Sequence, residues 1–96
     1  MSHGKIDFGE YLHQLRKEHK LSQKIVADKL GIDISMLSKI EHGERQVQSH
    51  MLKSVSELFD LNYRTLQIQF LNQRIEDEFG KEPFYKEAIA KLSKII

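Results

Sequence analysis

Histidine is the residue type in this sequence best suited to metal binding or proton transfer, and it occurs five times. None of these histidines has the HExxH spacing or another metal-ligand spacing with its neighbours: His3, His13, His19, His42 and His50. Cysteine is absent, which excludes a thiolate zinc site, a disulfide framework and a cysteine nucleophile. The sequence also lacks a nucleophile elbow and a glycine-rich phosphate loop. We therefore expect no bound metal, no cofactor and no enzymatic activity.

A segment of twenty residues, 23–42, carries a more informative pattern. Counted from Gln23, apolar residues occupy positions 4, 8, 10, 15 and 18: Val26, Leu30, Ile32, Leu37 and Ile40. Ala27 is small where two crossing helices would approach each other, and Gly31 suits a turn that needs a positive φ. The apolar residues would bury the inner faces and leave one face of the second helix free to enter a DNA major groove. The segment predicts a helix-turn-helix.

The elements that must position this segment are all expected to be helices. Apolar residues recur at helical spacing and no stretch alternates like a strand, so we predict an all-α fold. Residues suited to N-cap positions precede the first, second, third and fifth expected helices: Asp7, Ser22, Asp33 and Asn62. The fourth helix has Gln48 or Ser49 as candidate caps. The fifth ends at Phe79, and the sixth spans residues 84–96 with Pro83 near its first position.

Length and charge limit the organisation of the chain. Its 96 residues predict a single domain, 1–96, with a DNA-binding core at 7–61 and C-terminal helices at 62–96. The net charge of +1 does not by itself indicate nucleic acid. No apolar run approaches the roughly 20 residues that span a bilayer, and the polar start lacks a signal core. We expect a cytoplasmic protein without membrane contact.

Three stretches make the chain similar to a known family: LRKEHKLSQ (15–23), ADKLGID (27–33) and SMLSKIEHGER (35–45). They resemble the Xre-like helix-turn-helix proteins, which include phage repressors and Cro, over about residues 8–61. The resemblance implies a five-helix repressor-like domain, here with an added C-terminal helix, that usually binds a palindromic operator as a dimer. The sequence departs from the family pattern at Lys20, where glycine is frequent, and at Val47 and Gln48, where proline followed by serine or threonine is usual.

The resemblance also implies roles for individual residues. Base reading falls to the free face of the third helix, namely Ile34, Ser35, Ser38 and Lys39. Phosphate contact falls to residues around that helix, namely Gln23, His42 and Arg45. Serine hydroxyls discriminate weakly between base edges, and Lys39 can reach guanine acceptors. Arg16 and Glu41 match positions that form a structural ion pair between the first and third helices.

The C-terminal third of the chain needs a separate explanation. Tyr63, Leu66 and Phe70 lie on one face of the fifth helix and are expected to close the core. The nearly opposite face is also apolar, and the sixth helix carries an apolar arc. We assign these surfaces to dimerisation: Ile68, Leu71, Ile75, Phe79, Phe84, Ile89 and Leu92. The alternative is a hairpin within one chain.

Taken together, these observations predict a sequence-specific, double-stranded-DNA-binding transcriptional regulator. We expect a homodimeric repressor or autoregulator of bacterial, nucleoid-associated type; any small-molecule effector stays open. Restriction–modification controllers and antitoxins use the same domain and remain alternatives. A protein-interaction module that has lost DNA binding is the competitor from another class, because residues 16–45 carry a net charge of only +2, seven basic against five acidic residues.

Overall fold

The computed structural model describes residues 7–96, which form α-helices and one short 3₁₀ helix and contain no strand. The helices are α1 (Phe8–Glu18), α2 (Gln23–Leu30), α3 (Ile34–Glu41), η1 (Ser49–Met51), α4 (Leu52–Leu58), α5 (Tyr63–Phe79) and α6 (Tyr85–Ile95). The all-α prediction is confirmed. His3 and the rest of residues 1–6 lie outside the described part of the chain.

Short polar side chains start four of the helices, because they accept hydrogen bonds from backbone N–H groups that have no partner inside the helix. The predicted caps accept from the first turn as follows: Asp7 from Gly9 at 2.7 Å and Glu10 at 3.2 Å, Ser22 from Ile25 at 3.2 Å, Asp33 from Met36 at 2.7 Å and Asn62 from Thr65 at 2.9 Å. These four N-cap predictions are confirmed.

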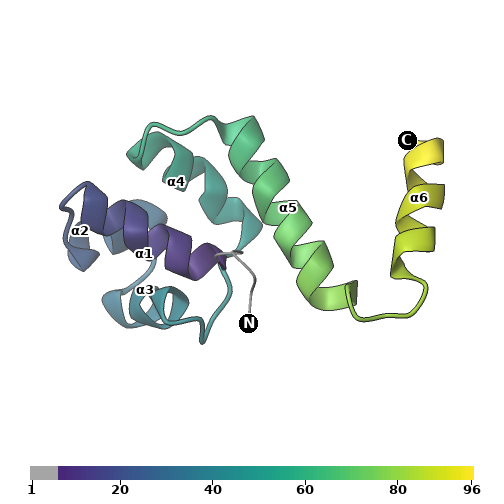
Figure 1. Cartoon of the computed structure of the whole chain (residues 1–96). Coiled ribbons are helices and arrows are strands. Elements are labelled where there is room, and N and C mark those ends of the chain that lie inside the picture. Colours follow the sequence, from purple (N-terminus) through teal and green to yellow (C-terminus); the bar gives the residue numbers. More distant parts are fainter. Residues whose placement is uncertain (1–6) are drawn as a thin grey trace.

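The helix-turn-helix is built by α2 and α3 around a turn at Gly31, which is left-handed at φ +73°. Val26, Leu30, Leu37 and Ile40 are buried in the core, and Ile32 packs half-buried against it. Helix α1 packs on α3, α2 packs on α3 and α4, and α4 packs on α5, so the core lies between α1–α4 and the first half of α5 (Figure 1).

Two predicted helix starts are wrong in detail. Neither Gln48 nor Ser49 caps α4 with its side chain; the chain enters α4 through η1, and the Gln48 amide donates to the Gln46 carbonyl at 3.4 Å. Val47 and Met51 are buried on either side of this turn, so core packing fixes the path here.

The sixth helix begins at Tyr85, one residue later than predicted, and Pro83 lies outside it. The backbone N–H of Tyr85 donates to the Glu82 carbonyl at 3.2 Å, and this turn delays the helix start. None of the helices in residues 7–96 is long and apolar enough to cross a membrane.

Helix α5 has one face in the core and one outside it. Leu66 and Phe70 are buried, and the Phe70 ring meets the Phe8 ring edge to face at 5.6 Å. The prediction that Tyr63 closes the core with them is wrong: Tyr63 is exposed, and its ring lies 5.1 Å from the Lys53 ammonium group at the surface. The opposite face stays exposed. Helix α6 stands apart from the core and runs back beside the far half of α5, and none of its residues is buried (Figure 1).

Candidate nucleic-acid interface

The outer face of α3 is the surface to which the resemblance assigns base reading. At about 100° per residue, five residues share an arc of about 140° on this face: Ile34, Ser35, Ser38, Lys39 and His42. All are exposed except Ser38, which is half-buried. The other side of α3 carries Leu37, Ile40 and Glu41, which are all buried. Helix α3 is thus divided lengthwise into a half that is buried against the rest of the domain and a half that is exposed at the surface.

His42 folds back onto the end of α3. Its Nδ1 atom lies 2.7 Å from the carbonyl oxygen of Ser38 and 3.5 Å from the Ser38 hydroxyl. An N–H that donates to this carbonyl satisfies one of the acceptors left unpaired at a helix C-terminus. His42 therefore orders the end of α3, and only its other ring nitrogen is left to meet another group.

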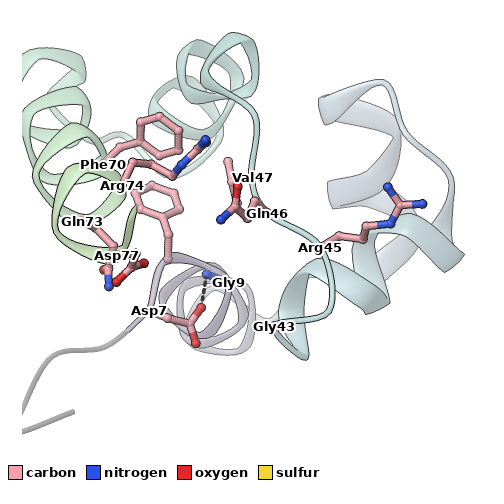
Figure 2. A pocket seen from close by; sticks show the side chains of 11 residues that line it. Asp7, Gly9, Gly43, Arg45, Gln46, Val47, Phe70, Gln73, Arg74 and Asp77 are labelled. Atoms are coloured by element: carbon pink, nitrogen blue, oxygen red, sulfur yellow. Dashed lines mark hydrogen bonds between the residues drawn. The ribbon is translucent and has the colours of Figure 1, made fainter. Parts of the chain in front are cut away.

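The loop after α3 holds Arg45 close to Lys39. Gly43 turns the chain with φ +80°. The backbone N–H groups of Glu44 and Arg45 then donate to the Lys39 carbonyl at 2.8 and 3.3 Å. The Arg45 side chain is exposed and points away from the pocket between α1 and α5 (Figure 2). The backbone bonds thus place two basic residues, Lys39 and Arg45, at the same end of α3.

Gln23, at the start of α2, is half-buried and points towards the inside of the fold. Its Nε2 atom donates to Glu41 Oε1 at 3.5 Å, the long limit of a hydrogen bond. A phosphate contact by this amide would replace a long bond to the Glu41 carboxylate with a bond to another anionic oxygen.

Arg16 and Glu41 form a bidentate ion pair that joins α1 to the end of α3. Arg16 Nε donates to Glu41 Oε2 at 2.7 Å, and Arg16 NH2 donates to Oε1 at 3.0 Å. A third donation, from Arg16 NH1 to the Leu21 carbonyl at 3.1 Å, fixes the turn between α1 and α2. Both residues are at least nine-tenths buried. The pair therefore sets how α3 is held against the rest of the domain.

Hydrogen bonding decides the ionisation of this pair. Burial opposes ionisation of Glu41, but donations from Arg16, His13 and Gln23 outweigh burial and lower the pKa of its carboxyl group. The bond to Glu41 raises the pKa of Arg16 against the opposing effect of burial. His13, whose Nδ1 lies 2.8 Å from Glu41 Oε1, was not predicted as a partner of this pair. Its position three residues before Arg16 on one helix face was the available signal.

The role of Gly9 was not predicted either, because the sequence does not show which backbone atoms pack against this residue. Helix α1 passes so close to the end of α3 that a Cβ at Gly9 would overlap the Ile40 carbonyl oxygen. The absence of a side chain at Gly9 lets Arg16 and Glu41 meet across the two helices.

A pocket of ≈ 260 Å³ lies behind the loop after α3, between the start of α1 and α5 (Figure 2). Phe70 and Arg74 line it from α5, with the guanidinium 5.8 Å from the ring centroid. Within residues 7–96, no cluster of histidine, aspartate and glutamate could hold a metal ion.

Comparison with known proteins adds one match. A family model described as "Helix-turn-helix" matches residues 12–66, which is more than half of the chain. The match contains α2, α3, the Arg16–Glu41 pair and α4, and it ends in the first turn of α5. No curated protein and no solved structure matched the chain.

Proposed function

The chain belongs to the helix-turn-helix family of the Xre type, a family of DNA-binding regulators, and on this premise we propose that it represses transcription by occupying a palindromic operator as a homodimer. In this proposal α3 of each subunit enters a major groove, and Ile34, Ser35, Ser38 and Lys39 meet base edges. Bound protein excludes other proteins from the same DNA.

The observation that carries the proposal is the division of α3 into a fixed half and an open half. The fixed half holds Leu37 and Ile40 in the core and Glu41 in the ion pair with Arg16. The open half has no packing role at Ser35 and Lys39, which are exposed. A recognition helix needs both properties, because its side chains must be presented on a rigid support to read base edges.

Phosphate contacts are assigned to Arg45, Gln23 and His42 around this face. Phosphate contacts set the position of a protein on DNA and carry no sequence information, whereas base-edge contacts supply preference. The overall charge of +1 is small, so affinity should depend on these few local contacts more than on the field of the whole molecule.

Selection of bound sequences from a random pool of duplex DNA tests the proposal. We expect enrichment of an inverted repeat, with half-sites about one helical turn apart. Affinity for the selected site should fall steeply with salt, because every neutralised phosphate releases counterions. If no sequence is enriched and no complex forms at low salt, the protein does not bind DNA and the proposal is wrong.

Two classes of variant separate the proposed roles. Arg45→Ala should weaken binding similarly on all sequences and reduce the logarithmic salt slope by about 1. Lys39→Ala should instead change the preferred base at one or two positions, by about 1–3 kcal/mol for a good contact. Lys29→Ala is the matched control, because this substitution removes the same charge from a lysine outside α3, which pairs with Glu57 of α4 at 3.7 Å. Equal effects of Lys39→Ala and Lys29→Ala would remove Lys39 from the base-reading set.

A further inference from the structure

The C-terminal part of the chain, which we call the arm (residues 68–96), exposes apolar side chains on both of its helices. The exposed residues are Ile68, Leu71, Ile75 and Phe79 on α5 and Phe84, Ile89, Leu92, Ile95 and Ile96 on or beside α6, with exposed fractions from 37% to 91%. Summed over these residues, the exposed area is on the order of 1000 Å² spread over both helices, whereas the largest apolar patch on an ordinary monomer is roughly 300–600 Å². Exposed apolar surface of this extent marks an interaction site.

The α6 of the same chain does not cover this surface. It reaches only the far half of α5, where two grooves of ≈ 380 and ≈ 390 Å³ separate the helices. Ile75, Tyr85 and Ile89 line both grooves. Ile68 and Leu71 line neither groove and lie nearer the core, beyond the end of α6. A chain folded on itself therefore leaves open grooves and an uncovered stretch of α5.

The charges on the two helices of the arm are opposite in sign and would complement those of a second copy of the chain. The last turn of α5 carries Glu76, Asp77 and Glu78 and no basic residue, although negative charge is unfavourable at a helix C-terminus. Helix α6 carries three lysines outside its apolar arc: Lys86, Lys91 and Lys94. No ion pair between described residues involves these lysines. The Tyr85 hydroxyl of the same chain already bonds to Glu76, so Asp77 and Glu78 are the acidic groups that the end of α5 offers, and α6 offers a basic side, each beside apolar surface.

We infer that the occupant of these grooves is the arm of a second copy of this chain, with α6 of each copy seated against α5 of the other around a two-fold axis. A two-fold arrangement brings each apolar surface against the same surface of the other subunit, and each acidic α5 end against the other subunit's lysines. The exposed area is of the size that a standard interface buries, about 800 Å² on each side. The inference deepens the proposed function, because it names the surface that would pair two DNA-binding units.

Sedimentation of the full chain and of two charge-matched variants tests the inference. The full chain should sediment as a dimer at micromolar concentration. Leu92→Glu puts a carboxylate into the apolar arc and should raise the dimer dissociation constant by about 100-fold or more. Ala90→Glu adds the same charge on the polar side of α6 and should change it by less than about twofold. Because α6 has no buried residue, both variants should keep the helical circular dichroism of the full chain.

Cysteine cross-linking tests which helices meet, and the absence of native cysteine makes the result unambiguous. Chains with Ile68→Cys or Leu71→Cys are mixed with chains carrying Leu92→Cys or Ile95→Cys and oxidised. We expect a covalent heterodimer from at least one pairing. Lys53→Cys on α4, paired with Ile95→Cys, is the control and should give none.

A full chain that stays monomeric at about 100 μM would overturn the inference. So would dimerisation unaffected by Leu92→Glu, or no heterodimer above the control from any pairing. Failure of the proposed function gives a different result: a chain that dimerises and cross-links through the arm but selects no DNA sequence. A monomer that selects a single half-site would refute the arm interface and leave DNA binding intact.

Discussion

Glu41→Ala should destabilise the whole domain, because it removes the acceptor that neutralises a nearly buried guanidinium. The Arg16 side chain is 11% exposed and that of Glu41 is 2% exposed, so water cannot replace the lost partner. Arg16 would keep its donation to the Leu21 carbonyl and lose both bonds to the carboxylate. His13 and Gln23 would lose their shared acceptor as well.

The expected loss is about 3–5 kcal/mol of unfolding free energy, the cost of leaving one member of a buried pair unpaired. This is a large part of the roughly 5–15 kcal/mol that stabilises a whole domain. For a domain of this size each kcal/mol corresponds to about 4–8 °C, so the melting temperature should fall by roughly 12–40 °C. Urea and thermal unfolding, followed by circular dichroism at fixed protein concentration, measure both quantities.

A double-mutant cycle with Arg16→Ala isolates the pair itself. The second substitution should cost much less once the first has been made, with a coupling of at least about 2 kcal/mol. Lys24 and Asp28 form the control pair at 3.3 Å, with side chains 73% and 68% exposed, and should couple by at most about 0.5 kcal/mol. Equal, near-zero coupling for both pairs would refute the argument that burial makes the Arg16–Glu41 pair important.

The pH dependence of this contribution has a definite sign. The pKa of Glu41 in the folded protein lies below its ordinary value of 4.5, so the unfolded chain takes up a proton more readily. Stability from the pair is therefore fully present above about pH 5 and is lost as pH falls through the folded pKa. The difference in unfolding free energy between the unmodified chain and Glu41→Gln should shrink from pH 7 to pH 3. A constant difference would contradict the assignment.

Three further outcomes follow from other features. Lys20→Gly should raise the unfolding free energy by about 0.5–1 kcal/mol, because Lys20 holds φ +55°, which strains any residue with a Cβ; a loss of stability in urea would contradict this. Gly9→Ala should lower the unfolding free energy by about 1–3 kcal/mol or more, because the added methyl group meets the Ile40 carbonyl. Glu10→Ala, at the neighbouring position, is the control and should be nearly neutral. Removal of residues 81–96 should leave a folded α1–α5 unit, because it takes away no buried side chain. This unit should bind a selected operator much more weakly in a gel shift, and unchanged affinity would show that α6 has no part in pairing the half-sites.

Sequence was sufficient where a structural feature depends on nearby residues. Asp7, Ser22, Asp33 and Asn62 were identified as caps because a cap acts on N–H groups only two or three residues away. The left-handed turn at Gly31 follows in the same way, since only glycine adopts that φ without strain.

Features that depend on distant packing were not predictable from the sequence. The start of α4 is fixed by burial of Val47 and Met51, and no local capping signal reports this. The need for glycine at position 9 arises from the Ile40 backbone, far along the chain. The inward turn of Gln23 depends on Glu41, which reaches it only after α1 and α3 have packed.

The lengthwise division of α3 has a consequence for how such a protein changes its target. Ile34, Ser35 and Lys39 contribute nothing to the core, so substitutions at these positions should alter operator preference at little cost in stability. His42 differs, because its ring contacts the Ser38 carbonyl at 2.7 Å and thereby orders the helix end. On the proposed base-reading role, single exchanges on the outer half of the helix should change DNA specificity while the other half keeps the domain folded. The same property makes this face a practical starting point for retargeting by selection.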